Sequence, residues 1–302
     1  MIEAHPIDPS VRANIESRLT AIEAEHGVRV LYACESGSRG WGFASPDSDY
    51  DVRFIYARPL SWYLRVSPQR DVIELPISDE LDINGWDLRK ALGLLKKGNA
   101  TLIEWLDSPV VYRADPKFLL AMRDAAQQTH QTERSFHHYA HMARKNYREY
   151  LQGDTVRLKK YLYVLRPLLA TLWIEQGRGI APMRFQDLVD AIVTDPALRA
   201  AIDQLLVIKR AAAESEYGLP LPAINAFVDA ELTRLESVLP PVLRDADYSI
   251  LDRLMMIPFW VMMISSSSST TSIMVTTSPL RSVVRMEMTP FPPRCIRRYS
   301  ST

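Results

Sequence analysis

Short apolar runs alternate with polar turns over the first third of the chain, which is the pattern of a small sheet. Residues 28–34 and 50–56 are rich in β-branched and aromatic residues and predict two buried strands. The shorter runs 71–76 and 80–83 predict two more strands, and Asn84-Gly85 is expected to end the second of them. We therefore expect a small mixed sheet within residues 1–115.

Helical periodicity precedes and follows these strands. Residues 9–26 predict a leading helix that ends at Gly27. Two short helices are expected over 87–97 and 100–106, capped by Asp87 and Asn99. From Pro116 onward the pattern is helical, with helices expected at 116–129, 132–152, 155–176, 184–193, 196–216 and 222–238.

These elements predict an α/β (α+β) fold in two units. A sheet unit, 1–115, would be flanked by helices and followed by an all-α unit, 116–254. Residues 155–176 are apolar on most faces, so we expect that helix at the centre of the second unit. From residue 255 the composition changes abruptly to a serine-rich mixture, which indicates a disordered tail or a reading-frame error near Leu254.

Composition indicates a globular protein without membrane or secretory features. The 302 residues are 47% hydrophobic and 24% charged, and the formal net charge is zero. Met1 to Arg18 is polar and charged, and the two cysteines are far apart, so we expect a cytoplasmic location and no membrane partner. Five arginines and one glutamate after residue 255 leave the rest slightly acidic. Any contact with RNA would therefore be local, and the oligomeric state is left open.

The polar positions that suggest chemistry lie between and within the first two expected strands. Gly37 and Ser38 form a turn, and a glycine there lets the backbone amides approach an anionic group. Asp49-x-Asp51 begins eleven residues after the serine. Because alternate residues of a strand share a face, Asp49, Asp51 and Arg53 are expected to point the same way. Arg53 is expected to form a structural ion pair with Asp51, and the alternative is that it contacts phosphate.

Two carboxylates on one face repel each other, and a divalent cation is the natural compensation. Mg²⁺ prefers carboxylate oxygens, and beside a phosphate-holding turn it predicts phosphoryl or nucleotidyl transfer. Asp82 is our choice for a third ligand because it points away from the apolar side of its strand. Glu74 is the alternative ligand, and Asp87 is better explained as a helix cap.

Several side chains are predicted to contact a nucleotide. The Ser38 hydroxyl and the amides near Gly37 are expected at the β and γ phosphates, with Arg39 either adding charge or lying on the surface. Lys159, Tyr163 and Arg166 share a face of the long central helix, since they are spaced at i, i+4 and i+7. They predict a triphosphate or acceptor contact, and the alternative is that they are the solvated ends of a core helix.

This pattern resembles the DNA polymerase β-type nucleotidyltransferase superfamily, and more narrowly the predicted nucleotidyltransferases associated with RNA ligase and polynucleotide kinase. The likeness covers about residues 10–250 and is carried by segments 35–42, 48–53, 81–92, 104–109 and 159–166. It implies transfer of a nucleoside monophosphate from an NTP to an acceptor hydroxyl, with two Mg²⁺ ions held by Asp49, Asp51 and Asp82. The third carboxylate commonly accepts the acceptor's proton, and family association makes an RNA end the expected acceptor.

Three alternatives remain open at this stage. The acceptor is a protein side chain in a protein-AMPylating regulator, although such enzymes are usually smaller single domains. A small-molecule hydroxyl is a second acceptor class. A catalytically inactive nucleotide-binding protein is the third alternative, and the three intact aspartates argue against it.

Overall fold

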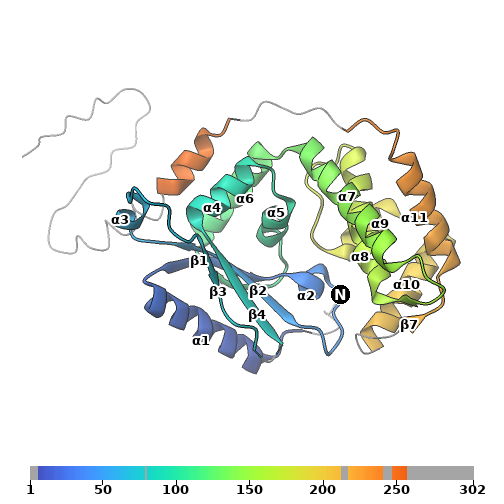
Figure 1. Ribbon diagram of the computed structural model, residues 1–302, viewed down its shortest axis with the longest axis horizontal. Helices are drawn as coiled ribbons and strands as arrows, with labels where there is room; N and C mark the ends of the chain where they lie inside the picture. Colours follow the sequence, from blue (N-terminus) through green and yellow to red (C-terminus); the bar gives the residue numbers. More distant parts are fainter. Residues whose placement is uncertain (1–5, 79, 212–216, 241–246, 257–302) are drawn as a thin grey trace, which may run out of the picture.

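The computed structural model describes residues 6–78, 80–211, 217–240 and 247–256 (Figure 1). The sheet forms one part of the molecule, and a bundle of helices lies beside it (Figure 1). The serine-rich tail and Cys295 lie outside the described residues. No helix in the described ranges is long and apolar enough to cross a membrane.

The predicted mixed sheet is confirmed and has five strands in the order β3-β4-β2-β1-β5. Only β2 and β4 pair in parallel, and the other neighbours are antiparallel. The strands are β1 (Arg29–Glu35), β2 (Tyr50–Ala57), β3 (Val72–Glu74), β4 (Leu81–Asp87) and β5 (Val111–Ala114). The sequence pattern missed β5, whose four residues are too short a run for alternation to be recognised.

The end predicted for β4 is wrong, because the strand continues through Asn84 and Gly85 to Asp87. Gly85 lies under the ring of Phe54 on β2, and a Cβ there would be 2.2 Å from ring carbons. The glycine therefore serves close packing between two paired strands, where the sequence suggested a turn.

Helices cover both faces of the sheet (Figure 1). Ile15, Leu19 and Ile22 of α1 pack with Val52 and Phe54 on one face. The other face of the sheet packs on three helices that follow β4 along the chain. These elements are α1 (Pro9–His26), α4 (Leu88–Lys96), α5 (Ala100–Leu106) and α6 (Pro116–Thr129). The Asp87 and Asn99 side chains cap α4 and α5 as expected.

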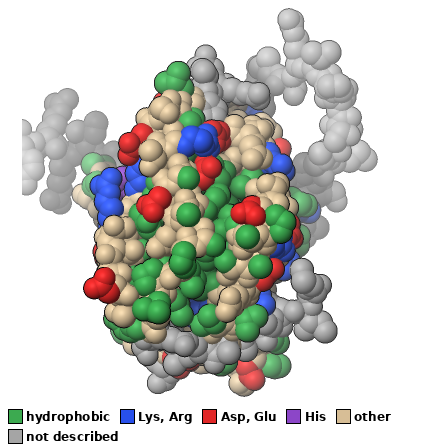
Figure 2. Space-filling model, turned by 90° about the vertical axis from the view of Figure 1, so that its right-hand side faces the viewer, with side chains coloured by type: hydrophobic (Ala, Val, Ile, Leu, Met, Phe, Trp, Pro, Cys, Tyr) green, Lys and Arg blue, Asp and Glu red, His purple; other side chains and the backbone are tan. Residues whose placement is uncertain are grey.

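The helical unit is built around α8, which is buried on most sides as expected. Its elements are α7 (Thr132–Tyr150), α8 (Lys159–Glu175), α9 (Phe185–Ile192), α10 (Pro196–Ala211) and α11 (Pro222–Arg234), with the hairpin β6 (Val156–Arg157) and β7 (Tyr217–Gly218). Figure 2 views the molecule from the side of the helical unit and shows apolar side chains spread over the middle of that face, among scattered charges. Val207, Tyr217 and Leu219 are large hydrophobic residues exposed on this unit.

The packing does not coincide with the predicted domain boundaries at 115/116 and 254/255. Phe118 and Met122 of α6 belong to the core beneath the sheet. Ile250, Leu251 and Leu254 join the same core from the far end of the described chain. The sheet unit is therefore completed by α6 and by a helical segment at 249–256, on either side of the helical unit in sequence.

Candidate active site

The turn at Gly37 is packed directly against the carboxylate of Asp51. β1 ends at Glu35, and the five-residue helix α2 (Gly37–Trp41) follows. Gly37 has φ +55°, and a Cβ on it would be 1.9 Å from Asp51 Oδ2. The Ser36 N–H donates to the Asp51 carbonyl at 2.8 Å. Only glycine can adopt this positive φ without strain and also leave room for the Asp51 carboxylate. The glycine at position 37 therefore allows the turn to pack against that carboxylate.

Parallel pairing of β2 and β4 brings two predicted metal ligands together. Asp51 lies opposite Asp82 in the register of these strands. Burial raises the pKa of Asp51, Arg53 opposes that change, and the charges of Asp82 and Asp49 add to it. Asp49 is exposed immediately before β2. Asp49 and Asp82 are therefore each close enough to Asp51 for their charges to act on it.

The alternative ligand, Glu74, is placed differently. It lies on the edge strand β3, where its carboxylate accepts from Arg70 at 2.6 Å and from Asn84 at 3.0 Å. Asp82, and not Glu74, stands opposite Asp51. Asp87 is a helix cap as expected, because its Oδ1 accepts from the Arg89 N–H at 2.9 Å.

Arg53 joins the two facing carboxylates. Its Nη2 donates to Asp51 Oδ1 at 2.9 Å and to Asp82 Oδ2 at 2.7 Å. The predicted pair with Asp51 is confirmed. The pair with Asp82 was missed, because it depends on the parallel register of β2 with β4.

The carboxylates suit Mg²⁺ by their chemistry, although they do not converge as a metal cage. Asp49, Asp51 and Asp82 supply the hard oxygen donors that this ion prefers. Among the described residues, no group of three or more His, Cys, Asp or Glu side chains is arranged to hold a metal ion. A positive group, the Arg53 guanidinium, already lies between two of the three carboxylates.

Glu35 is a buried acid at this site that sequence reasoning missed. Its Oε1 accepts the Asp51 backbone N–H at 2.8 Å, and its Oε2 accepts the Tyr112 hydroxyl. Burial raises the pKa of Glu35 to about 7, against the lowering effect of these two hydrogen bonds. A glutamate at the end of an otherwise apolar strand was the available signal. Its position indicates that it fixes the backbone from which the Asp51 carboxylate projects.

Arg39 organises the loop that leads into β2. Its guanidinium donates to the Ser48 carbonyl at 2.6 Å and to the Asp49 carbonyl at 3.2 Å. It also lies over the Tyr50 ring, 4.0 Å from the centroid. Arg39 is buried, so the alternative that it lies on the surface is wrong. Its contacts here are with protein groups, and its predicted contact with phosphate stays a prediction.

Lys209 of α10 reaches the same loop from the helical unit. Its Nζ is 2.5 Å from Ser45 Oγ and 3.5 Å from Ser48 Oγ, and the residue is 5% exposed. Sequence reasoning did not select it, because a lysine in the last turn of a helix is ordinarily solvated. The contact ties the segment just before Asp49 to the helical unit.

A buried charged network joins the two units behind α2. Glu104 of α5 accepts from Arg166 Nη1 at 2.9 Å and from the Tyr139 hydroxyl at 2.7 Å. Arg166 is 3% exposed, and its guanidinium lies 4.9 Å from the centroid of the Trp41 ring. These partners differ from the nucleotide contact predicted for Arg166. The residue lies inside the join between the units, next to the helix that carries the Gly37 turn.

The other two predicted nucleotide contacts on α8 are Lys159 and Tyr163, and only for Tyr163 does the structure show a contact with α2. Tyr163 packs edge-to-face on Trp41, with ring centroids 5.6 Å apart, so it lies at the end of α2. Lys160 Nζ lies 4.9 Å from the Tyr163 ring centroid. Lys159 is the first residue of α8. The roles of Lys159 and Tyr163 in nucleotide binding stay predictions.

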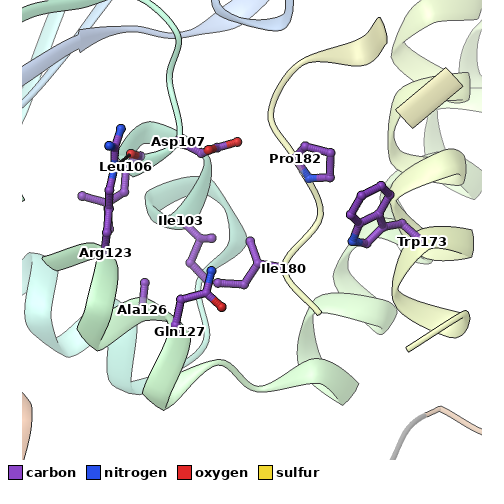
Figure 3. A pocket seen from close by; sticks show the side chains of 9 residues that line it. All are labelled: Ile103, Leu106, Asp107, Arg123, Ala126, Gln127, Trp173, Ile180 and Pro182. Atoms are coloured by element: carbon purple, nitrogen blue, oxygen red, sulfur yellow. Dashed lines mark hydrogen bonds between the residues drawn. The ribbon is translucent and has the colours of Figure 1, made fainter. Parts of the chain in front are cut away.

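A cavity of about 220 Å³ lies on the other side of α5, between α6, the end of α8 and the segment 177–184 (Figure 3). Two of its charged lining residues, Arg123 and Asp107, are hydrogen-bonded to backbone groups. Arg123 Nε donates to the Leu106 carbonyl at 2.7 Å, and Asp107 Oδ2 accepts the Met183 N–H at 2.8 Å. None of the predicted site residues lines this cavity, and the contact of Asp107 with Met183 joins the sheet unit to the helical unit there.

Comparison with known proteins adds to this geometry. Residues 11–257 match the sequence model of RlaP, the RNA repair pathway DNA polymerase beta family. The chain belongs to this family. The RlaP match spans every predicted site residue, from Gly37 to Arg166, and makes the chain a polymerase β-type nucleotidyltransferase.

Two individual proteins illustrate the range of similarity. The uncharacterized protein YcgL of Bacillus subtilis is 45% identical over 225 residues, which are 74% of this chain and 86% of YcgL. A nucleotidyltransferase-like protein from Exiguobacterium sibiricum is 12% identical, with 83% of this chain and 80% of that chain covered and a TM-score of 0.29. The assignment of this chain to the RlaP family rests on the family model, which covers residues 11–257.

Proposed function

We propose that this protein transfers a nucleoside monophosphate from an NTP to the hydroxyl of an RNA end in the presence of Mg²⁺. The observation that carries the proposal is the placement of Asp51 opposite Asp82, with the Gly37 turn packed on the Asp51 carboxylate. A phosphate-holding turn beside facing carboxylates suits chemistry in which charge on a triphosphate must be neutralised. The RNA acceptor rests on the description of the family.

Each residue has a definite part in this proposal. The Ser38 hydroxyl and the amides of the Gly37 turn hold the β and γ phosphates. Asp49, Asp51 and Asp82 would hold two Mg²⁺ ions, which when bound neutralise charge on the triphosphate and on the acceptor oxygen. Glu35 fixes the backbone of Asp51 through its hydrogen bond to the N–H of that residue.

The reaction is a single displacement without a covalent enzyme intermediate. The acceptor oxygen forms a bond to the α-phosphorus as the bond to the bridging oxygen of pyrophosphate breaks. Asp82 accepts the proton that the acceptor hydroxyl releases, and pyrophosphate leaves with the electron pair of the broken bond. Positioning of the two reactants and neutralisation of charge supply most of the rate enhancement.

Transfer of an α-³²P label tests this function. Each NTP is incubated with Mg²⁺ and, separately, with RNA, protein and metabolite pools. The proposal predicts label on RNA with the wild-type protein and none with Asp51→Asn. Asp203→Asn is the matched control, since it removes an aspartate from an exposed ion pair with Arg199 on α10. If only protein or only a metabolite became labelled, RNA would be the wrong acceptor and the labelled pool would contain the right one. If no pool became labelled, the proposed activity would be contradicted.

A further inference from the structure

Arg53 occupies a position that a metal ion would otherwise share. One nitrogen, Nη2, donates to Asp51 Oδ1 at 2.9 Å and to Asp82 Oδ2 at 2.7 Å. The Arg53 side chain is 17% exposed and those of Asp51 and Asp82 are 28% and 35% exposed, so this contact is partly shielded from solvent. A guanidinium stays protonated at any physiological pH. The facing carboxylates therefore have a permanent positive partner within the protein itself.

The need for such a partner follows from the strands. Asp51 and Asp82 are opposite each other on paired strands, whose backbones lie about 4.8 Å apart. Two carboxylates held this closely repel each other, and partial burial makes their charge more costly. Sequence reasoning assigned the compensation to a divalent cation. In the structure the compensation comes from Arg53.

A second set of contacts holds the guanidinium independently of the carboxylates. Arg53 Nη1 donates to the Asp82 backbone carbonyl at 2.9 Å and to the Val52 carbonyl at 3.1 Å. Nη2 can therefore lose its carboxylate partners while Nη1 keeps the side chain in place. This division of the fork is available to arginine and not to the single ammonium of lysine.

We propose that Arg53 is a built-in counter-cation that competes with divalent metal for Asp51 and Asp82. This inference rests on the proposed function, since it assumes that these aspartates bind metal. Metal entry displaces Arg53 Nη2 from the two carboxylate oxygens, and the metal-free site is kept stable by the same contacts. Arg53 thus lowers the affinity of the free protein for metal and stabilises its metal-free fold.

Mn²⁺ binding to the metal-free full-length protein, without nucleotide, tests the proposal. Free Mn²⁺ is measured by electron paramagnetic resonance across a titration of wild type, Arg53→Gln and Arg53→Lys. Arg70→Gln is the matched control, because it removes a positive charge from an exposed ion pair with Glu74 on the same sheet. We expect Arg53→Gln to bind Mn²⁺ at least about tenfold more tightly than wild type, as expected when a close positive charge is removed. Arg53→Lys should fall between them, and Arg70→Gln should match wild type.

Thermal melts in EDTA supply a readout that does not depend on activity. Arg53→Gln should melt below wild type without metal and gain more than wild type when Mn²⁺ is added. Unchanged or weaker Mn²⁺ binding by both Arg53 variants, with normal binding by wild type, would overturn the role of Arg53 alone. If Arg53→Gln does not fold, the affinity of Arg53→Lys decides the question. Failure of wild type and every variant to bind Mn²⁺ would overturn both this inference and the proposed metal site.

Discussion

At the scale of single residues, the site depends on two positions, Gly37 and Glu35, whose surroundings leave almost no room for substitution. Gly37 has both a left-handed backbone and a carboxylate oxygen where its Cβ would lie. Glu35 is fully buried and bonded to the backbone of Asp51. One position was evident from the sequence as a glycine turn, whereas the role of the other needed the contact with β2.

Gly37→Ala should abolish transfer as well as lower stability. The new Cβ would have to push Asp51 aside, and the positive φ adds backbone strain of about 1–3 kcal/mol. Gly42→Ala is the control, since Gly42 has φ +87° but open space around its Cβ position. Denaturant melts and transfer assays should show both variants destabilised and only Gly37→Ala inactive. Equal activities of the two variants would contradict the close packing of turn and carboxylate.

Glu35 should make stability fall as the pH rises. Its folded pKa is about 7 against an ordinary value of 4.5, so between these values the native state keeps a proton that the unfolded chain has released. Glu35→Gln carries no such proton. Its unfolding free energy relative to wild type should therefore increase by up to about 3 kcal/mol from pH 4.5 to 7.5. Urea melts in EDTA at several pH values measure this, and parallel profiles for the two proteins would exclude it.

At the scale of elements, the strands and helices that carry the chemistry could be predicted and their partners could not. Periodicity and caps located β1, β2 and the longer helices, because these signals lie within each segment, whereas the five-residue helix α2 was predicted only as a turn. The parallel pairing of β2 with β4 is a tertiary fact, and it alone puts Asp82 opposite Asp51. The end of β4 was predicted wrongly at Gly85, because the sequence alone does not distinguish a glycine required for packing on Phe54 from a glycine required for a turn.

At the scale of the whole molecule, the helical unit is coupled to the site through buried polar groups. Lys209 reaches the loop before Asp49, and the Glu104 network reaches α2. Sequence reasoning placed Arg166 at the nucleotide because a basic stripe on an apolar helix resembles a ligand contact. A buried partner on α5 accounts for the same arginine in the structure.

Glu104 and Arg166 should show strong energetic coupling. Removing one partner leaves a buried charge uncompensated, so Glu104→Gln or Arg166→Met should each cost about 3 kcal/mol of unfolding free energy. The double variant should cost clearly less than the sum of the two. A double-mutant cycle from denaturant melts measures the difference. The exposed pair of Arg234 and Glu175 is the control, and additive losses at Glu104 and Arg166 would show that no such network operates.

The most direct test of the account compares Asp82→Asn with Glu74→Gln in the transfer of labelled nucleoside monophosphate at saturating Mg²⁺. The facing of Asp51 and Asp82 across the parallel strands is the central claim, and Glu74 lies on the neighbouring edge strand. We predict that Asp82→Asn loses transfer by at least about a hundredfold, the order seen when a group aligned with developing charge is removed, while Glu74→Gln stays close to wild type. An active Asp82→Asn together with an inactive Glu74→Gln would show that the essential carboxylate lies on β3 and not on β4, and would contradict the central claim.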